Sequence, residues 1–528
     1  MYKKRSIHLL CVTAVLSWPF PLMATEVPED LLHLPETAVL QSPAQVQRFY
    51  TLAQHKLVWQ SAERYQQLLD ELQALADDGL NPDAYGLDRL YNYLELESDD
   101  PSWWQERDLL ATQAYLQALK DLMFGRLNPA QVEPIWQQET PLQRPDSDAQ
   151  NLFALQGLDR LQDTFTQARP SDPRYHHLRQ AYAHLRQQDQ SALWQEIPAG
   201  PLLRPGQADA RVQAVRNRLL PELQTDTPDL YDSALSDAVR QFQQAHALNA
   251  DAIIGPATLQ ALNSSPTDRL NQIRINLERF RWLAREMEAH MVLVDIAGAQ
   301  VSYWHDGQIV WQGRAQVGRA ERPTPILKSQ ITHFTFNPTW TVPPTILRRD
   351  KLPEIRRDLG YLQRHRMRVL NFQGQELDPN EVDWWNPGGI MLRQDAGPGN
   401  ALGQVAIRFP NPHAVYLHDT PSQRLFEQEQ RAFSSGCVRV EKALDLVAEL
   451  IEWNRIPGDQ PMNRLLEDGR TRNVNLVRNV PVLLAYWTAE ADAQGRVSYR
   501  PDVYQMDATL LRALENSLGQ GIKPPSLH

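Results

Sequence analysis

The chain has 528 residues, more than a single hydrophobic core usually serves, so about three domains of about 100 to 200 residues each are expected. It carries 53 Lys and Arg against 64 Asp and Glu, which gives a formal net charge of -11 with 22% charged residues. This balance is typical of a soluble acidic protein. Because an excess of Lys and Arg is what neutralises a phosphate backbone, nucleic acid is not an expected partner.

The N-terminus has the order of a secretory signal. Three basic residues at 3–5 precede an apolar run from Ile7 to Phe20, and the segment ends at Ala24. This order predicts a signal peptide over 1–24 with cleavage after Ala24. A retained membrane anchor is the alternative, but the run is shorter than the about 20 residues that a spanning helix needs. The mature chain is therefore expected to be exported and to have no transmembrane span.

Two cysteines are present, and only one is expected in the mature chain. Cys11 lies in the predicted signal and would be removed with it, so Cys437 would remain alone. One thiol cannot form an internal disulfide in an oxidising compartment. A lone cysteine is in general more often a small buried apolar residue than a nucleophile. In an exported protein, however, an unpaired cysteine indicates catalysis.

Residues 25–205 predict a helical scaffold domain. The stretch is rich in Leu, Ala, Gln, Asp and Glu, and prolines interrupt it at intervals. It contains no catalytic constellation. Its apolar positions recur at helical spacing, for example Leu57, Tyr65, Leu68, Leu69 and Leu72.

Residues 206–266 predict a small bundle of three helices. Apolar positions mark two short helix faces, and a turn that ends at Gly255 leads into a third helix with a proline at its first position. This stretch resembles a peptidoglycan-binding domain through Asp251, Gly255 and Thr258 of its signature. The second signature position holds Ala252 where the family has glycine, which bears on the geometry of the turn.

One further helix is predicted over 267–290 as a linker, and the composition then changes. Residues 291–490 contain short β-branched and aromatic runs separated by Gly, Pro or Asn, which predicts a mostly β domain. Within it, 350–403 alternates helical charge with turns, and both a cap or lid over a site and a solvated insertion without a role are open. The last stretch, 491–528, is expected to be a C-terminal tail. The fold class is therefore multidomain α+β.

Cys437 lies in the segment 434–440 together with the groups that acyl transfer through a thioester requires. A thiol is mostly protonated near neutral pH and needs a base, and His418 at the end of an apolar strand is the candidate. Gly436 permits close approach of the backbone to a substrate carbonyl, so amides beside it are candidates for an oxyanion site. Arg439 is a candidate to hold a substrate carboxylate or a developing negative charge.

The two segments around His418 and Cys437 resemble the catalytic motif of the L,D-transpeptidases with the YkuD-type fold, and the resemblance extends over 291–487. Together with the signal, the helical region and the peptidoglycan-binding-like unit, the chain is similar to the large periplasmic YcbB-type members. Many smaller members carry histidine where Ser435 stands, so His418 is the only histidine of the motif here. The adjacent Asp419 is expected to point to the opposite strand face, which leaves a backbone carbonyl as a candidate to orient His418.

The resemblance implies a reaction in which the Cys437 thiolate attacks the diaminopimelate carbonyl of a tetrapeptide stem and releases D-alanine. The acyl group then passes from the thioester to the side-chain amine of another stem, which forms a 3→3 cross-link. His418 would serve as the base, and Gly436, Arg439 and Ser435 would bind oxyanion and substrate. Peptidoglycan stem peptides are thus the expected partners in the periplasm, and other cell-wall synthesis proteins are further candidates. Because carbapenems acylate members of this family, the same is expected of Cys437.

No cofactor or metal is expected, because His290, His305, His333 and His413 lack the ligand spacing of zinc hydrolases. Two alternatives to a transpeptidase stay open. Water as the acceptor would give an L,D-carboxypeptidase, and a decayed site would leave a non-catalytic wall-binding protein. The intact motif argues against decay, but the sequence does not choose between an amine and water as acceptor.

Overall fold

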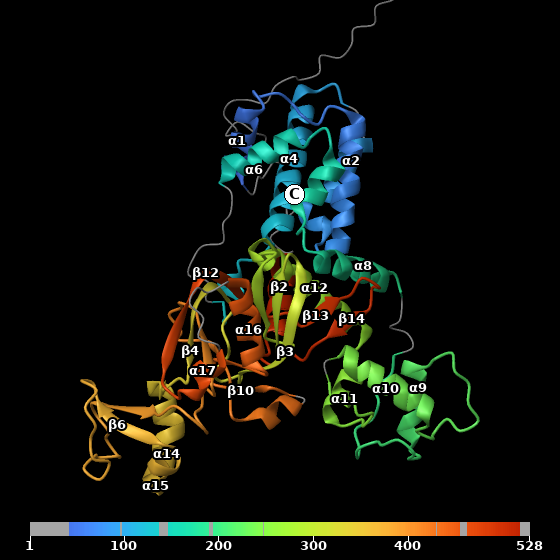
Figure 1. Ribbon diagram of the computed structural model, residues 1–528. Helices are drawn as coiled ribbons and strands as arrows, with labels where there is room; N and C mark the ends of the chain where they lie inside the picture. Colours follow the sequence, from blue (N-terminus) through green and yellow to red (C-terminus); the bar gives the residue numbers. More distant parts are fainter. Residues whose placement is uncertain are drawn as a thin grey trace, which may run out of the picture.

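The computed structural model describes residues 42–95, 98–136, 146–188, 194–246, 248–428, 430–454 and 462–517. The signal peptide predicted over 1–24 lies outside these ranges. A helical region lies at one end of the molecule beside a β domain, and two small units extend from the β domain on the side away from the helices (Figure 1). The predicted multidomain α+β class is confirmed. None of the helices within the described ranges is both long and apolar enough to cross a bilayer.

The helical region is built around α4 (Pro101–Phe124), which is buried along most of its length. Polar residues at the N-caps satisfy the first free amides; the Asp100 carboxylate, for example, accepts from the Ser102 amide. The surrounding helices pack their apolar faces on α4 and form a core of their own. They are α1 (Pro43–Leu52), α2 (Ala62–Ala74), α3 (Leu87–Glu95), α6 (Ser147–Gln156) and α7 (Leu161–Ala168), with α5 (Pro129–Val132), α8 (Pro173–Gln187) and the 3-10 turns η2 (Leu75–Asp78) and η3 (Pro82–Tyr85) beside them.

The β domain is a closed sheet. Its nine strands follow the order β10-β3-β11-β9-β8-β4-β12-β1-β2, and β2 pairs in turn with β3, so the sheet returns on itself. The first part of β3 pairs with β2, and its last residues pair with β11 and β10. The strands are β1 (Met291–Asp295), β2 (Gln300–His305), β3 (Gln308–Gly318), β4 (Leu327–Phe336), β8 (Val405–Arg408), β9 (Leu417–His418), β10 (Ala432–Ser434), β11 (Val438–Val440) and β12 (Arg472–Ala485), and the helices α12 (Pro266–Leu283) and α16 (Ala443–Asn454) pack on them.

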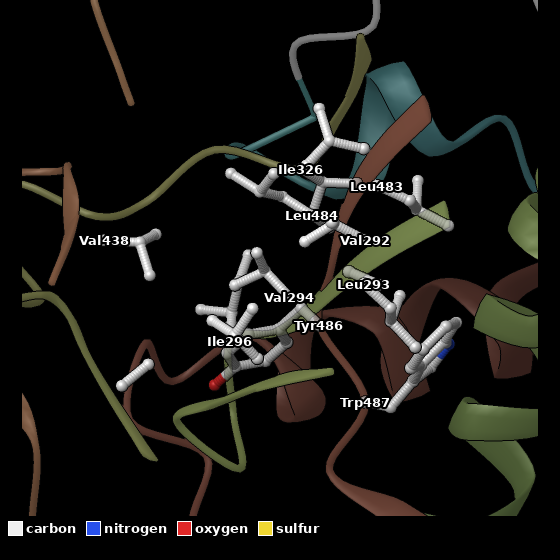
Figure 2. Packing of buried hydrophobic residues seen from close by; sticks show 14 of the residues in the cluster. Val292, Leu293, Val294, Ile296, Ile326, Val438, Leu483, Leu484, Tyr486 and Trp487 are labelled. Carbon is white, nitrogen blue, oxygen red and sulfur yellow. The ribbon is translucent and has the colours of Figure 1, made fainter. Parts of the chain in front are cut away.

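The pair β1 and β12 is buried on both faces, which explains its continuous apolar sequence. Leu293 and Leu483 lie opposite each other and point toward the helices, whereas Val294 points to the other face of the sheet (Figure 2). Trp487, just after β12, stacks on Phe280 of α12 with ring centroids 4.7 Å apart. The predicted linker helix is therefore part of the wall of the β domain.

The helical region and the β domain share a core and a buried polar network. Tyr175 of α8 belongs to the same apolar cluster as the strands. Asp78 is fully buried and accepts hydrogen bonds from Arg169 and Tyr175, both at 2.9 Å. Arg179 donates to the same carboxylate at 3.0 Å, and Arg281 of α12 donates to the Asp78 carbonyl at 2.7 Å. These contacts hold the two parts in one fixed arrangement.

Between β4 and β8 the chain forms a small unit that extends away from the barrel (Figure 1). We call residues 340–403 the insertion unit. Its core is separate from that of the barrel and includes Trp340, so the unit begins ahead of the stretch 350–403 set apart from sequence. Its sheet has the order β5 (Trp340–Thr341), β7 (Ile390–Gln394), β6 (Met367–Asn371), and its helices are α13 (Pro344–Ile346), the π-helix η6 (Leu347–Lys351), α14 (Leu352–Arg357) and α15 (Gly360–Arg364).

The predicted three-helix unit consists of α9 (Ala210–Leu219), α10 (Ser233–Ala245) and α11 (Pro256–Leu262) around a small core. The buried Gln243 side chain holds its signature turn, because it donates to Asp251 at 3.3 Å and to Thr258 at 3.2 Å. It also accepts from the Ala252 amide at 2.9 Å. Ala252 has φ 61, the left-handed region that favours glycine, so the turn keeps the conformation of the signature at a steric cost. Gly255 is the N-cap of α11.

The chain after β12 is folded as well. Residues 491–517, predicted from sequence as part of a C-terminal tail, begin at the last residue of β13 (Ala489–Ala491) and contain β14 (Val497–Tyr499) and α18 (Asp507–Asn516). Arg279 of α12 donates to Asp507 at 2.6 Å, which ties α18 to the barrel wall. Tyr499 contacts the three-helix unit, because the His246 ring of that unit stacks on the Tyr499 ring with centroids 5.4 Å apart. The rest of the predicted tail lies outside the described residues.

Asp78→Ala is expected to lower the free energy of unfolding by about 3 to 5 kcal/mol, because Arg169, Arg179 and Tyr175 would lose a buried acceptor. Burial alone would raise the pKa of Asp78, but the Arg169 and Arg179 guanidiniums outweigh it and hold that pKa below its ordinary value. A carboxylate with a lowered pKa stabilises the fold above its unfolded pKa, so this contribution is lost as the pH falls below about 4. Urea unfolding at neutral pH and at lower pH measures both effects.

The matched control for this change is Asp159→Asn in the same helical region. The Asp159 carboxylate is 84% exposed and pairs with Arg64. Its removal should cost no more than about 1 kcal/mol, because water screens an exposed pair. Equal losses in the two variants would contradict the importance of the buried network.

Candidate active site

Three neighbouring strands bring the candidate residues into one row. β11 pairs in parallel with β9, which places Arg439 beside His418, and antiparallel with β3, which places Arg439 beside Gln316. Lateral neighbours in a sheet share a face, and so do residues two apart on one strand. Cys437 lies in the bend just before β11, and its thiol adjoins this row, because Arg439, Arg408 and hydrogen bonding by Tyr416 all act on its pKa. Arg439 also donates from Nη1 to Gln316 Oε1 at 3.0 Å.

His418 is a neutral imidazole with a defined tautomer. The residue is 4% exposed, and Nδ1 lies 2.5 Å from the carbonyl oxygen of Asp419. Because a carbonyl only accepts, Nδ1 carries the proton and Nε2 keeps a lone pair. Burial, and next the positive charge of Arg439, lower the pKa of His418 to about 3. The carboxylate of Asp419 is engaged elsewhere, since it accepts from the Gln404 amide at 2.8 Å, so the Asp419 carbonyl is the group that orients the ring.

The Cys437 thiol is held in its protonated form. Burial raises its pKa above the ordinary value of 9.0, against the opposing effects of hydrogen bonding by Tyr416 and the charges of Arg408 and Arg439. In this structure Sγ donates to the carbonyl oxygen of Ala414 at 3.7 Å. These two pKa shifts favour a thiol and a neutral imidazole at rest over a thiolate and an imidazolium.

Two residues that were not singled out from the sequence complete this face. Tyr416 lies two residues before His418, and their ring centroids are 5.6 Å apart. The Arg408 guanidinium lies 4.0 Å from the centroid of the Tyr416 ring, and the same ring packs against the core of the insertion unit. Strand alternation is a signal that puts Tyr416 with His418. The place of Arg408 depends on the pairing of β8 with β9, which no local pattern specifies.

The loop that carries the thiol is fixed from within by Ser434. The Ser434 hydroxyl donates to the Cys437 carbonyl at 2.5 Å and accepts from the Gly436 amide at 3.1 Å. Gly436 has φ 113, which residues with a Cβ rarely adopt. The Gly436 N–H is therefore occupied, whereas the Cys437 N–H makes no hydrogen bond to any part of the chain that the structure describes. Of the two, the Cys437 amide is the donor available to an oxyanion.

The turn between β3 and β4 holds the same loop from outside. Tyr504 braces this turn, because its hydroxyl donates to the Gly318 carbonyl at 2.8 Å and accepts from the Thr324 amide at 3.1 Å. Three residues of the turn donate to three successive residues of the loop: the Arg319 amide to the Ser434 carbonyl at 3.1 Å, Arg322 Nη1 to the Ser435 hydroxyl at 2.9 Å, and the Thr324 hydroxyl to the Gly436 carbonyl at 2.9 Å.

In the described part of the chain, no set of three or more His, Cys, Asp or Glu side chains is placed to hold a metal ion.

The structure brings together one of the two predicted groups of site residues and leaves the other apart. The first group meets at β9, at β11 and at the bend just before β11: His418 and Arg439 are on the two strands, and Ser435, Gly436 and Cys437 form the bend. The second group, Asp251, Gly255 and Thr258, lies in the separate three-helix unit, where Asp251 and Thr258 accept hydrogen bonds from Gln243.

Family models match three parts of the chain. Residues 289–457 match YkuD, the L,D-transpeptidase catalytic domain. Residues 44–181 match a scaffold domain, and residues 209–262 match the model described as "Putative peptidoglycan binding domain". The resemblance drawn from the motifs around His418 and Cys437 is thereby confirmed.

A curated protein of Haemophilus influenzae, named "Putative L,D-transpeptidase", is 34% identical over 222 residues, which are 41% of this chain and 44% of that protein. The match therefore spans less than half of this relative. Two solved structures are similar at low identity. The L,D-transpeptidase of Xylanimonas cellulosilytica is 19% identical with a TM-score of 0.17, and covers 54% of this chain and 98% of its own. That of Stackebrandtia nassauensis is 13% identical with a TM-score of 0.21, and covers 53% and 94%.

Gly436→Ala is expected to destabilise the fold by about 1 to 3 kcal/mol through backbone strain alone. Its φ of 113 is unfavourable for alanine, whereas the nearest atom to an added Cβ, the Pro323 carbonyl oxygen, is 3.6 Å away. Gly388→Ala is the matched control, because nothing lies within 4 Å of its Cβ position and its φ is not left-handed. Thermal unfolding compares the two, and an unchanged Tm for Gly436→Ala would contradict the strain.

The Cys437 thiol is expected to react with iodoacetamide at a rate that still rises above pH 9.0, because burial raises its pKa beyond that ordinary value. Only the thiolate is alkylated, so the rate follows its fraction. Alkylation quenched at set times and measured by mass spectrometry gives the rate at each pH, with Cys437→Ser as the control for labelling at other residues. A plateau already at about pH 7 would instead show a thiolate stabilised at rest.

Proposed function

We propose that this protein uses Cys437 to form 3→3 cross-links between peptidoglycan stem peptides, because residues 289–457 match the L,D-transpeptidase catalytic domain. The observation that carries the proposal is the pairing of β11 with β9, which sets Arg439 beside His418, with Cys437 in the bend just before β11. A thiol, a neutral base with a fixed tautomer and a cation are the groups that acyl transfer through a thioester needs.

The first half of the reaction forms the thioester. His418 Nε2 accepts the thiol proton while Cys437 Sγ bonds to the diaminopimelate carbonyl carbon of a tetrapeptide stem. The oxyanion of the tetrahedral intermediate takes a hydrogen bond from the Cys437 amide. When the intermediate collapses, the bond to D-alanine breaks, and the imidazolium returns its proton to the leaving amine. His418 is then neutral again and ready for the second half.

The second half transfers the acyl group. The side-chain amine of another stem attacks the thioester carbonyl, His418 accepts a proton from it, and Cys437 leaves with that proton as a thiol. Arg439 supports both halves as a fixed cation for a substrate carboxylate or for the developing charge, because Gln316 already holds its guanidinium in place. Ser435 takes part through the loop that it shares with Gly436 and Cys437.

The place of action follows from the other parts of the chain. The three-helix unit with Asp251, Gly255 and Thr258 would hold the enzyme on the wall, and the insertion unit would cap the substrate at Tyr416. The predicted export signal over 1–24 would deliver the mature chain to the periplasm. Stem peptides are the proposed substrates, and other cell-wall synthesis proteins are proposed partners. No cofactor is needed for the chemistry as written.

Cys437→Ala is expected to abolish formation of cross-linked dimers from purified tetrapeptide muropeptides, and His418→Ala to lower kcat by about 10²-fold to 10⁴-fold through loss of the base. Mass spectrometry of the products distinguishes a dimer with loss of D-alanine from a tripeptide monomer. A carbapenem should add its mass to the wild type and not to Cys437→Ala.

Each other outcome has a definite meaning. Tripeptide monomers without dimers would assign water as the acceptor and make the protein an L,D-carboxypeptidase. Undiminished dimer formation by a folded Cys437→Ala variant would overturn the proposed nucleophile. A wild-type protein with neither product nor carbapenem adduct would support a wall-binding protein without catalysis.

A further inference from the structure

One side chain joins the insertion unit to the loop that carries Cys437. Arg322, in the turn between β3 and β4, donates from Nη1 to Asp350 Oδ2 at 2.6 Å and from Nη2 to Asp350 Oδ1 at 2.8 Å. The same Nη1 donates to the Ser435 hydroxyl at 2.9 Å. Ser435 is two residues before Cys437. The guanidinium is therefore shared between an insertion-unit carboxylate and the nucleophile loop.

The partners of Arg322 are held by different parts of the fold. Asp350 lies in the π-helix η6, and Leu347 and Leu352 on either side of it are buried in the core of the insertion unit. π-Helical turns are rare and often occur at functional sites. Ser435 belongs to the barrel loop, which the β3–β4 turn holds at each of three successive residues. A displacement of the insertion unit would therefore pull Asp350 from a group that also sets the position of Ser435.

The ion pair between Arg322 and Asp350 can fix the insertion unit relative to the β3–β4 turn. The Arg322 and Asp350 side chains are 12% and 32% exposed, so the pair is better shielded from water than most surface pairs. A two-pronged guanidinium–carboxylate contact fixes orientation as well as distance. An ammonium group would provide a charge without this geometry.

We propose that Arg322 is a positioning residue that couples the placement of the insertion unit to the geometry of the Cys437 loop. The inference rests on the proposed function for its meaning, because the reaction requires Sγ at a fixed position over the substrate carbonyl. The side-chain hydrogen bonds of Arg322 go to Asp350 and Ser435, and none of them reaches Sγ. It acts through Ser435, and it is engaged only while Asp350 is in place.

The experiment compares Asp350→Asn, Ser435→Ala and the double variant with the wild type. Each single change should lower kcat by about 10-fold with KM nearly unchanged, because a small misplacement of reacting groups affects the chemical step. The kcat of the double variant should lie within about twofold of that of the less active single variant, because both changes disable the same connection. Asp358→Asn is the matched control, since Asp358 pairs with Arg364 at 2.6 Å within the insertion unit and does not reach the loop.

A second measurement does not depend on the proposed reaction. The rate of Cys437 alkylation by iodoacetamide should rise about threefold or more in Asp350→Asn and in Ser435→Ala, because a loosened loop exposes the half-buried thiol further. It should stay at the wild-type value in Asp358→Asn. Circular dichroism and Tm establish that each variant is folded.

The outcomes separate the two hypotheses. If the wild type makes neither dimers nor tripeptides, the proposed function fails, and the alkylation rates still decide whether Arg322 couples the two parts. Additive losses in the double variant, an unchanged Asp350→Asn, or a change in KM alone would overturn the coupling. A loss in Asp358→Asn equal to that in Asp350→Asn would show a general effect of the insertion unit and would also overturn it.

Discussion

The parallel pairing of β11 with β9 is the constraint on which the rest of the site depends. It sets Arg439 beside His418 and brings the bend that carries Cys437 to the end of the same strand pair. A shift of one residue in this register would turn Arg439 to the opposite face, because side chains alternate along a strand. The closed sheet prevents such a shift, since β11 is fixed on its other side by β3 and the ring returns through β2.

Burial then determines the chemistry of this row. It lowers the pKa of His418 to about 3 and raises that of Cys437, so the two groups rest in their neutral forms. Neutral groups are the less costly state in a poorly solvated site. The consequence for the proposed reaction is that proton transfer to His418 accompanies attack by Sγ. Arg439 and Arg408 supply positive charge that is available when negative charge develops.

The loop around Cys437 depends on parts of the chain that are distant in sequence. Thr324 reaches Gly436 across 112 positions, and Tyr504 braces Thr324 from the folded C-terminal stretch across 180 positions. Arg322 adds the insertion unit to this set. The region 289–457 that matches the catalytic domain therefore depends on residues outside it. Helix α12 packs on the barrel wall, and residues after β12 help to hold the loop around Cys437.

The sequence by itself determined the helical and β-rich parts and the resemblance of one region to the L,D-transpeptidase catalytic domain, and it proposed the pair Cys437 and His418, because these follow from local periodicity and from short motifs. It offered a backbone carbonyl as a candidate to orient His418 without saying which one, and it did not single out Tyr416, Arg408 or Arg322. Only the tertiary structure decided those contacts, since they depend on strand order, register and a folded C-terminal stretch that local patterns do not encode. Asp251 and Thr258 belong to a local motif whose hydrogen bonds are made inside the three-helix unit. Only the tertiary structure shows that this unit is separate from the site.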